Sequence, residues 1–210
     1  MNYIDYFMSL NQIDNDFKKV VALQIDNNNK TVGKDWQIKN LAWHRAIYAE
    51  AVELFDSTAW KWWKFETCDH DNIKMEYVDI LHFLVSWAII KEELEFLHEC
   101  LSDKYITRNS IHKSIDNVIK YSADRTLMYT IESFCELKEH IFDDTKDIYD
   151  LYFAKNWLNG FRQENGYKDG VYKKIINGKE DNKILTELVI LHGLETAKQK
   201  FAELYREAKK

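Results

Sequence analysis

Two pairs of acidic residues are the clearest candidates for chemistry in this chain. Glu50 and Glu53 form one pair and Glu76 and Asp79 form the other, each with a spacing of three residues. On an α-helix this spacing places both carboxylates on one face. Four carboxylates that converge from two helices are suited to bind a hard divalent cation such as Mg²⁺. We therefore predict that these four residues are the ligands of a metal site.

The apolar residues around the two pairs strengthen this prediction. Ile47 and Leu54 share a helical face with Glu50, and the sequence around Glu76 repeats the pattern. A buried and unpaired carboxylate is costly, so a cation or a set of hydrogen bonds must compensate. The chain has 35 acidic residues, and we expect the other pairs with the same spacing to mark solvated helix faces: Glu92/Glu95, Glu136/Glu139 and Asp147/Asp150.

The composition predicts the elements that must position these residues. The 210 residues include no proline and only six glycines, and 46% of them are hydrophobic. Such a chain favours long helices around a core of ample size. We predict an all-α fold and a single domain over residues 1–210. Asp71 or Asn72 is the candidate N-cap of the helix that carries the second acidic pair. The predicted helices cover approximately Tyr3–Gln24, Trp36–Ser57, Asn72–Leu101, Ile111–Tyr121, Leu127–Glu139, Asp147–Phe161 and, in one or two pieces, Asn182–Ala208.

Charge and cysteine content restrict the partners and the compartment. A net charge of −6 argues against a nucleic acid polymer or an anionic membrane as partner. The longest apolar run, Ile80–Ile90, is too short to span a membrane and predicts a core helix. Cys68, Cys100 and Cys135 form no CxxC pattern, which predicts reduced, buried thiols in a cytoplasmic protein. The N-terminal residues show no secretory signal.

A second candidate region combines glycines with basic residues. Four of the six glycines lie in residues 160–178, interleaved with lysines and an arginine. Just before it, Lys155, Asn159 and Arg162 share one helical face. By itself this region is typical of a mobile, charged surface loop. Together with a carboxylate site, it supplies the basic groups that a nucleoside triphosphate requires.

Three blocks of sequence resemble the dimeric, all-α dUTPase family, relatives of the MazG-type nucleotide pyrophosphohydrolases. The blocks are YAEAVELFDSTAWKWWK, NIKMEYVDILHF and KNWLNGFRQENGYKDGVYKKIINGKEDN. The resemblance implies a helical bundle of the all-α NTP pyrophosphohydrolase type and a homodimer. It also implies Mg²⁺-dependent hydrolysis of dUTP, and of dUDP, to dUMP. Such a reaction keeps uracil out of DNA.

The resemblance also implies roles for individual residues. Glu50, Glu53, Glu76 and Asp79 would bind Mg²⁺, and Glu50 or Glu53 would take a proton from the attacking water. Gln24 and Asn28 would read uracil, and Trp62 would help to close the base pocket. Phe83, with His82, would pack against the deoxyribose. The implied phosphate-binding residues are Lys155, Asn159, Arg162, Tyr167, Lys174 and Asn182.

Other readings of the same residues remain open. The nearest is a related pyrophosphohydrolase that acts on dCTP or on nucleoside triphosphates more broadly. A di-iron helical bundle is a second reading, because Glu95 and His98 form an ExxH pattern, but that site requires a second such motif and two further glutamates. A nucleotide sensor without catalytic activity is a third.

Overall fold

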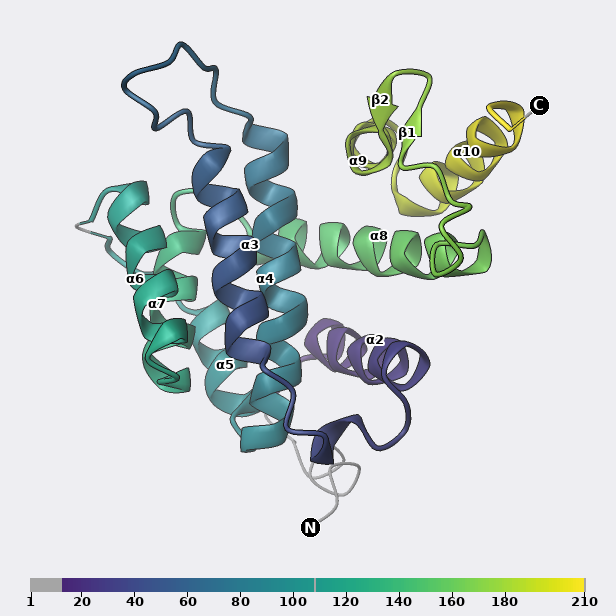
Figure 1. Ribbon diagram of the computed structural model, residues 1–210. Helices are drawn as coiled ribbons and strands as arrows, with labels where there is room; N and C mark the ends of the chain where they lie inside the picture. The colour runs from purple at the N-terminus through teal and green to yellow at the C-terminus, as the bar shows by residue number, and fades with distance from the viewer. Residues whose placement is uncertain (1–12, 108, 210) are drawn as a thin grey trace. The chain divides into compact units, whose positions relative to one another are not determined.

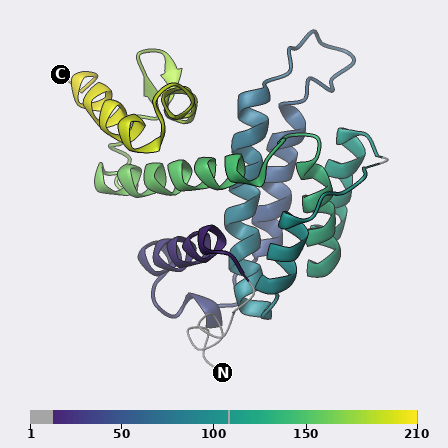
Figure 2. The same cartoon turned by 180° about the vertical axis from the view of Figure 1, so that it is seen from behind.

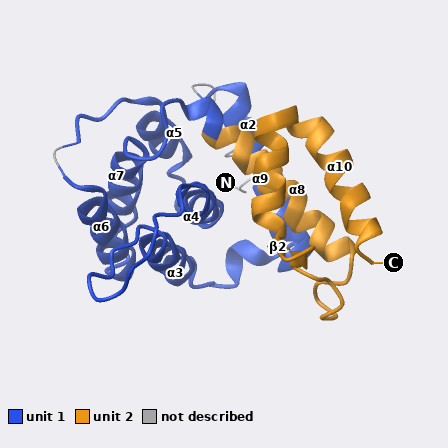
Figure 3. Cartoon of the chain, turned by 90° about the horizontal axis from the view of Figure 1, so that it is seen from above, with its two compact units in different colours: residues 1–147 blue, residues 148–210 orange. Residues whose placement is uncertain are grey.

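The computed structural model describes residues 13–107 and 109–209. Within these ranges every regular element is helical except for two strands of two residues each (Figure 1). The all-α prediction is therefore confirmed. The chain divides into two compact units, residues 1–147 and residues 148–210 (Figure 3). The single domain over residues 1–210 stays a prediction.

The first unit is a set of helices packed around α4. Helix α3 packs against α4 and α6, α6 packs against α7, and α2 and α5 also contact α4. Figures 1 and 2 show α3 and α4 side by side, joined by a connection that extends beyond their ends. The elements of this unit are α2 (Asn15–Thr31), the 3-10 helix η1 (Trp36–Ile38), α3 (Trp43–Asp56), α4 (His70–Lys91), α5 (Leu94–Ser102), α6 (Ile111–Ala123) and α7 (Leu127–Lys138).

Helix α4 is the core helix that the apolar run predicted. Its buried residues lie on all sides of the helix and include Tyr77, Leu81 and Leu84. The ring of Tyr77 stacks on Phe134 with centroids 4.1 Å apart, which joins α4 to α7. None of the helices within residues 13–107 and 109–209 is both long and apolar enough to cross a membrane.

The observed helix boundaries correct several predictions in this unit. The helix predicted from Trp36 is interrupted, because Asn40 adopts a left-handed conformation (φ 48°) between η1 and α3. The first predicted helix ends later than expected: α2 runs on to Thr31, and residues 3–12 of the prediction lie outside the described part of the chain. The N-cap of α4 is Asp69, whose side chain accepts from the Asn72 N–H at 3.1 Å, so the prediction of Asp71 or Asn72 was wrong.

The helix predicted to run from Asn72 to Leu101 ends instead at Lys91. Glu92 adopts a left-handed conformation (φ 59°, ψ 37°), and the N–H of Glu93 donates to the carbonyl of Ala88 at 2.9 Å. This is the geometry of a Schellman motif, a helix ending that usually has glycine at the left-handed position. With glutamate there, the sequence carried no signal for the break.

The second unit holds most of α8 (Thr145–Glu164) and the C-terminal elements. Strands β1 (Ile175–Ile176) and β2 (Lys179–Glu180) pair antiparallel through a turn in which Asn177 and Gly178 both have positive φ. Such Asn-Gly turns match the twist of a two-residue hairpin. Helices α9 (Asp181–His192) and α10 (Leu194–Glu207) pack together and are separated by Gly193 (φ 73°). The predicted terminal helical region therefore consists of two helices.

The three cysteines are free thiols, as predicted. Cys100 and Cys135 are buried, but Cys68 is exposed in the connection between α3 and α4, so the prediction of a buried thiol was wrong there.

The left-handed conformation of Glu92 leads to a stability prediction. Glu92→Gly should raise the free energy of unfolding by about 1 kcal/mol, because glycine adopts this conformation without the Cβ clash. Thermal unfolding should show a midpoint roughly 2–4 °C higher. Glu99→Gly is the control, since Glu99 is an exposed glutamate within α5, where glycine should destabilise. Equal effects of the two substitutions would contradict the conformational argument.

Candidate active site

Three of the four predicted metal ligands converge in the first unit. Glu50 of α3 and Glu76 and Asp79 of α4 each offer a carboxylate oxygen, and these oxygens all lie within 4.8 Å of one another. Glu76 is only 7% exposed, and the other two are half-buried. The three-residue spacing on α4 and the packing of α3 on α4 produce this arrangement. A set of anionic oxygen donors is the kind of site that Mg²⁺ prefers, so these residues fit that cation.

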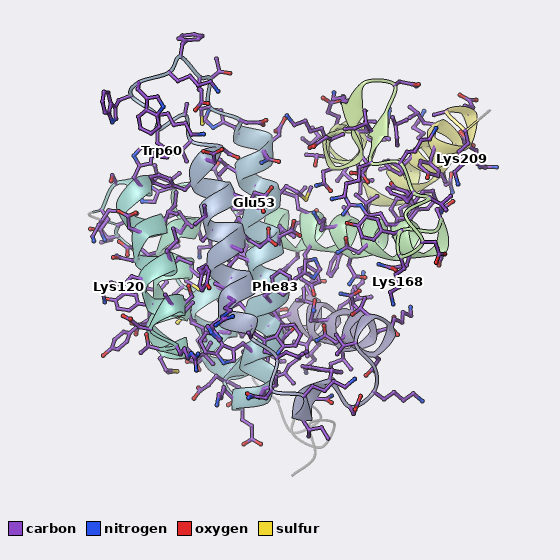
Figure 4. The ribbon with its side chains drawn as sticks, in the orientation of Figure 1. Glu53, Trp60, Phe83, Lys120, Lys168 and Lys209 are labelled. Atoms are coloured by element: carbon purple, nitrogen blue, oxygen red, sulfur yellow. The ribbon has the colours of Figure 1, made fainter. Side chains whose placement is uncertain are left out.

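Glu53 lies outside this group of three. It is exposed on α3, one turn beyond Glu50, and lines a surface cavity of about 590 Å³ together with Asp56 and Glu66. Figure 4 labels Glu53 on α3 and Phe83 on α4, the two helices that carry the acidic pairs. The spacing of the acidic residues did not distinguish Glu53 from the other three, because i and i+3 positions share a face without being equally buried.

A cluster of buried polar side chains joins α2 to α4. We call it the amide cluster: Gln24 and Asn28 of α2, and His82 and Ser86 of α4, all at most 4% exposed. The two amides meet each other, with Gln24 Nε2 donating to Asn28 Oδ1 at 3.0 Å. His82 Nδ1 lies 2.7 Å from Gln24 Oε1. Gln24 Nε2 and Asn28 Nδ2 each donate to Ser86 Oγ at 3.0 Å.

The amide cluster brings together three residues predicted from sequence and one that was missed. Gln24, Asn28 and His82 were candidates for base and sugar contacts, and Ser86 was not. A sequence signal existed, because Ser86 follows His82 by four residues in a helix that is otherwise apolar. A polar residue on a core face is the informative exception to a hydrophobic pattern.

The predicted aromatic residues are less enclosed. Phe83 is half-buried, with its ring 6.3 Å from that of Trp43. The Trp43 indole N–H is buried and has no hydrogen-bond partner within residues 13–107 and 109–209. Trp62 is 89% exposed in the connection between α3 and α4 and contacts Trp63, with centroids 5.5 Å apart. Trp60, labelled in Figure 4, packs on Phe55 of α3.

In the second unit the predicted phosphate-binding residues surround a buried ion pair. Arg162 donates to both carboxylate oxygens of Asp181, at 2.9 and 2.8 Å. It also donates to Asn182 Oδ1 at 3.0 Å and to Asn159 Oδ1 at 3.4 Å. Lys155 donates to the same Asn182 oxygen at 3.2 Å and is 4% exposed. Four predicted residues are therefore connected through Arg162 and the side-chain oxygen of Asn182, and the carboxylate that anchors Arg162 belongs to Asp181, a residue that was not predicted.

Tyr167 and Lys174 lie on the exposed side of this unit. Tyr167 is 40% exposed, Lys174 is exposed, and the ammonium of Lys174 lies 5.6 Å from the centre of the Tyr167 ring. This is a cation–π distance. Both residues are therefore available to solvent, unlike Lys155 and Arg162.

Asp181 owes its ionised state to its neighbours. Burial by itself would raise the pKa of this carboxyl, but the guanidinium of Arg162, the hydroxyl of Tyr172 and the N–H of Asn182 outweigh burial and lower the pKa below its usual value. Tyr172 donates to Asp181 Oδ2 at 2.8 Å. Burial, and then the adjacent carboxylate, raise the pKa of Tyr172, so the phenol remains a donor.

The all-α fold and the converging carboxylates are the features expected of an all-α hydrolase that acts on nucleotides. A comparison with protein families supports this class: the family model described as dUTPase matches residues 16–167. The chain therefore belongs to the dUTPase family and is a dUTP diphosphatase. The match includes Glu50, Glu76 and Asp79, which we call the acidic group, and also the amide cluster. Lys174, Asp181 and Asn182 lie beyond it. A search of curated proteins found no match.

The lowered pKa of Asp181 predicts how the second unit responds to pH. A carboxyl with a lowered folded-state pKa contributes stability above its unfolded value, which is about 3.9, and loses that contribution as the pH falls through the folded value. Asp181→Asn should therefore flatten the dependence of thermal unfolding on pH below about pH 4. At neutral pH it should destabilise by about 3–5 kcal/mol, because Arg162 is left buried without its partner carboxylate.

The control for this prediction is Asp169→Asn, which alters an exposed carboxylate in the same unit. That variant should unfold like the wild-type protein at every pH. A wild-type pH profile retained by Asp181→Asn would contradict the role assigned to the ion pair.

Proposed function

We propose that the hydrolysis of dUTP to dUMP and pyrophosphate depends on Mg²⁺ at the acidic group, and that the protein also hydrolyses dUDP to dUMP and phosphate. The observation that carries this proposal is the convergence of the carboxylates of Glu50, Glu76 and Asp79. These residues would hold the cation, with Glu53 as a fourth candidate. When bound, the cation would neutralise phosphate charge and acidify the attacking water.

The side chains of the site supply the remaining chemistry. Glu50 and Glu53 are the candidates for accepting the proton of the attacking water, and both lie on α3 one turn apart. Glu53→Gln separates the two roles proposed for this residue. A ligand would be expected to lose cation affinity on substitution, whereas a proton acceptor would lose turnover with its cation affinity retained.

The amide cluster supports the proposed recognition of uracil. Gln24 and Asn28 are buried and already hydrogen-bonded, so their amides are held in place before a base arrives. We assign them the contacts with uracil. His82 and Phe83 would pack against the deoxyribose, and Trp62 would close over the base.

The basic residues of the second unit are proposed to bind the phosphates. The set comprises Lys155, Asn159, Arg162, Tyr167, Lys174 and Asn182. Support comes from the hydrogen bonds that join Lys155, Asn159 and Asn182 to one another through Arg162, which Asp181 anchors. We also propose that the enzyme is a homodimer, that it acts in the cytoplasm, and that its activity keeps uracil out of DNA.

A nucleotide panel tests the proposed function. Hydrolysis of dUTP, dCTP, dTTP and UTP should be followed by release of pyrophosphate, with and without a chelator. The proposal requires Mg²⁺-dependent turnover that is fastest with dUTP. Faster turnover of dCTP, or similar rates with all four nucleotides, would instead support a related pyrophosphohydrolase with a different base preference. Tight dUTP binding without turnover would indicate a sensor.

The most buried carboxylate of the acidic group gives the sharpest test of the metal site. Glu76→Gln keeps the shape of the side chain but removes its charge, so Mg²⁺ affinity measured by calorimetry should fall at least ~10-fold. Turnover of dUTP should fall by roughly 100-fold or more. The control is Glu95→Gln, because Glu95 is exposed on α5 and forms, with Glu92, another acidic pair with a spacing of three. It should change neither the Mg²⁺ affinity nor the turnover. Unchanged Mg²⁺ affinity in Glu76→Gln would remove Glu76 from the metal site.

The proposed packing of Phe83 against the sugar predicts a change in selectivity. Phe83→Ala should open space for a 2′-hydroxyl and reduce the preference for dUTP over UTP by roughly 10-fold, measured as a ratio of kcat/KM values. Phe96→Ala, another partly exposed phenylalanine of the same unit, is the control and should leave the ratio unchanged. A wild-type ratio in Phe83→Ala would exclude Phe83 from sugar selection.

A further inference from the structure

The hydroxyl of Ser86 is the centre of the amide cluster. The side chain is fully buried, and Ser86 Oγ is in contact with three groups. It donates to the backbone carbonyl of His82 at 2.9 Å and accepts from the amide nitrogens of Gln24 and Asn28 at 3.0 Å each. A hydroxyl has one hydrogen and two lone pairs, so all three of its hydrogen-bonding positions are occupied.

This arrangement determines how the two amides are oriented. The carbonyl of His82 is part of the backbone of α4 and can only accept, so it takes the hydroxyl hydrogen of Ser86. Ser86 Oγ then presents only lone pairs to α2. Each amide must therefore direct its NH₂ group, and not its oxygen, towards Ser86.

The same polarity extends to the imidazole of His82. With Gln24 Nε2 directed to Ser86 and to Asn28 Oδ1, the oxygen of Gln24 is directed to His82. Two acceptors cannot form a hydrogen bond, so His82 Nδ1 must carry a hydrogen at this 2.7 Å contact. The carbonyl of His82 therefore fixes the direction of the Ser86 hydroxyl. The Ser86 hydroxyl in turn fixes which atoms of Gln24, Asn28 and His82 donate and which accept.

We propose that Ser86 is a positioning residue that fixes the orientation of the Gln24 and Asn28 amides and thereby sets the preference for uracil over cytosine. The inference rests on the proposed role of these amides in reading the base. Uracil presents an N3–H donor beside a C4 carbonyl, whereas cytosine presents an N3 acceptor beside an amino group. Turning an amide side chain around exchanges its NH₂ donor for its oxygen acceptor. A pocket that selects uracil therefore requires the Gln24 and Asn28 amides to keep one orientation.

The test compares two buried serines. Ser86→Ala removes the acceptor that both amides share, and the kcat/KM preference for dUTP over dCTP should fall at least ~10-fold, mainly through a higher KM for dUTP. The control is Ser122→Ala. Ser122 is also fully buried in a helix, α6, and donates to a backbone carbonyl four residues earlier, Val118 O at 2.7 Å. Within the described part of the chain its hydroxyl bonds no amide side chain.

Ser122→Ala should leave the nucleotide preference unchanged while showing what the loss of such a hydroxyl does to thermal stability. If Ser86→Ala lowers stability as Ser122→Ala does but keeps the full preference for dUTP, Ser86 is a structural residue only and the inference is wrong. If the wild-type protein itself turns over dUTP and dCTP equally, the proposed reading of uracil fails, and the inference with it. The two failures are therefore distinguishable.

A measurement on the wild-type protein tests the orientation directly, even if Ser86→Ala does not fold. In ¹⁵N NMR spectra near neutral pH, neutral His82 should carry its hydrogen on Nδ1, and the side-chain NH₂ of Asn28 should exchange slowly with solvent. A hydrogen on Nε2 with a bare Nδ1 would mean that Gln24 is turned the other way. That result would overturn the assigned order of donors and acceptors.

Discussion

The packing of α3 against α4 is the interaction on which the candidate site depends, because it brings three carboxylates together. Glu50, Glu76 and Asp79 place oxygens within 4.8 Å of one another, and two ionised groups about 4 Å apart repel by roughly 4 kcal/mol at an effective dielectric constant of 20. The packing of α3 against the buried surface of α4 holds them in place. A divalent cation bound at these oxygens would offset this repulsion.

Helix α4 relates this acidic group to the amide cluster. Glu76 and Asp79 stand one turn apart on it, and His82 and Ser86 follow within the next two turns. Because a helix is rigid over this length, the acidic group and the hydrogen-bonded side chains that face α2 keep a constant separation along the axis. The same buried helix would therefore position both the proposed phosphate chemistry and the proposed base recognition.

Much of the helical fold and of the acidic group was predictable from the sequence, because both depend on the spacing of residues that are close in the chain. Apolar periodicity located α4, and acidic residues on its core-facing stripe identified Glu76 as a buried carboxylate. The break at Glu92 was not predictable, since a glutamate occupies a position where glycine is usual. The position of Ser86 on an apolar helix was a local signal, but its bond to Gln24 was not predictable, and neither was the bond of Asp181 to Arg162. Such partnerships depend on tertiary packing, which helical periodicity does not encode.

The most direct test of the account is the position of a bound cation. Crystals grown with Mn²⁺ in place of Mg²⁺, examined by anomalous scattering, should show a peak within coordination distance of Glu50, Glu76 and Asp79. A peak confined to the neighbouring cavity lined by Glu53, Asp56 and Glu66, with none at the three converging carboxylates, would contradict it.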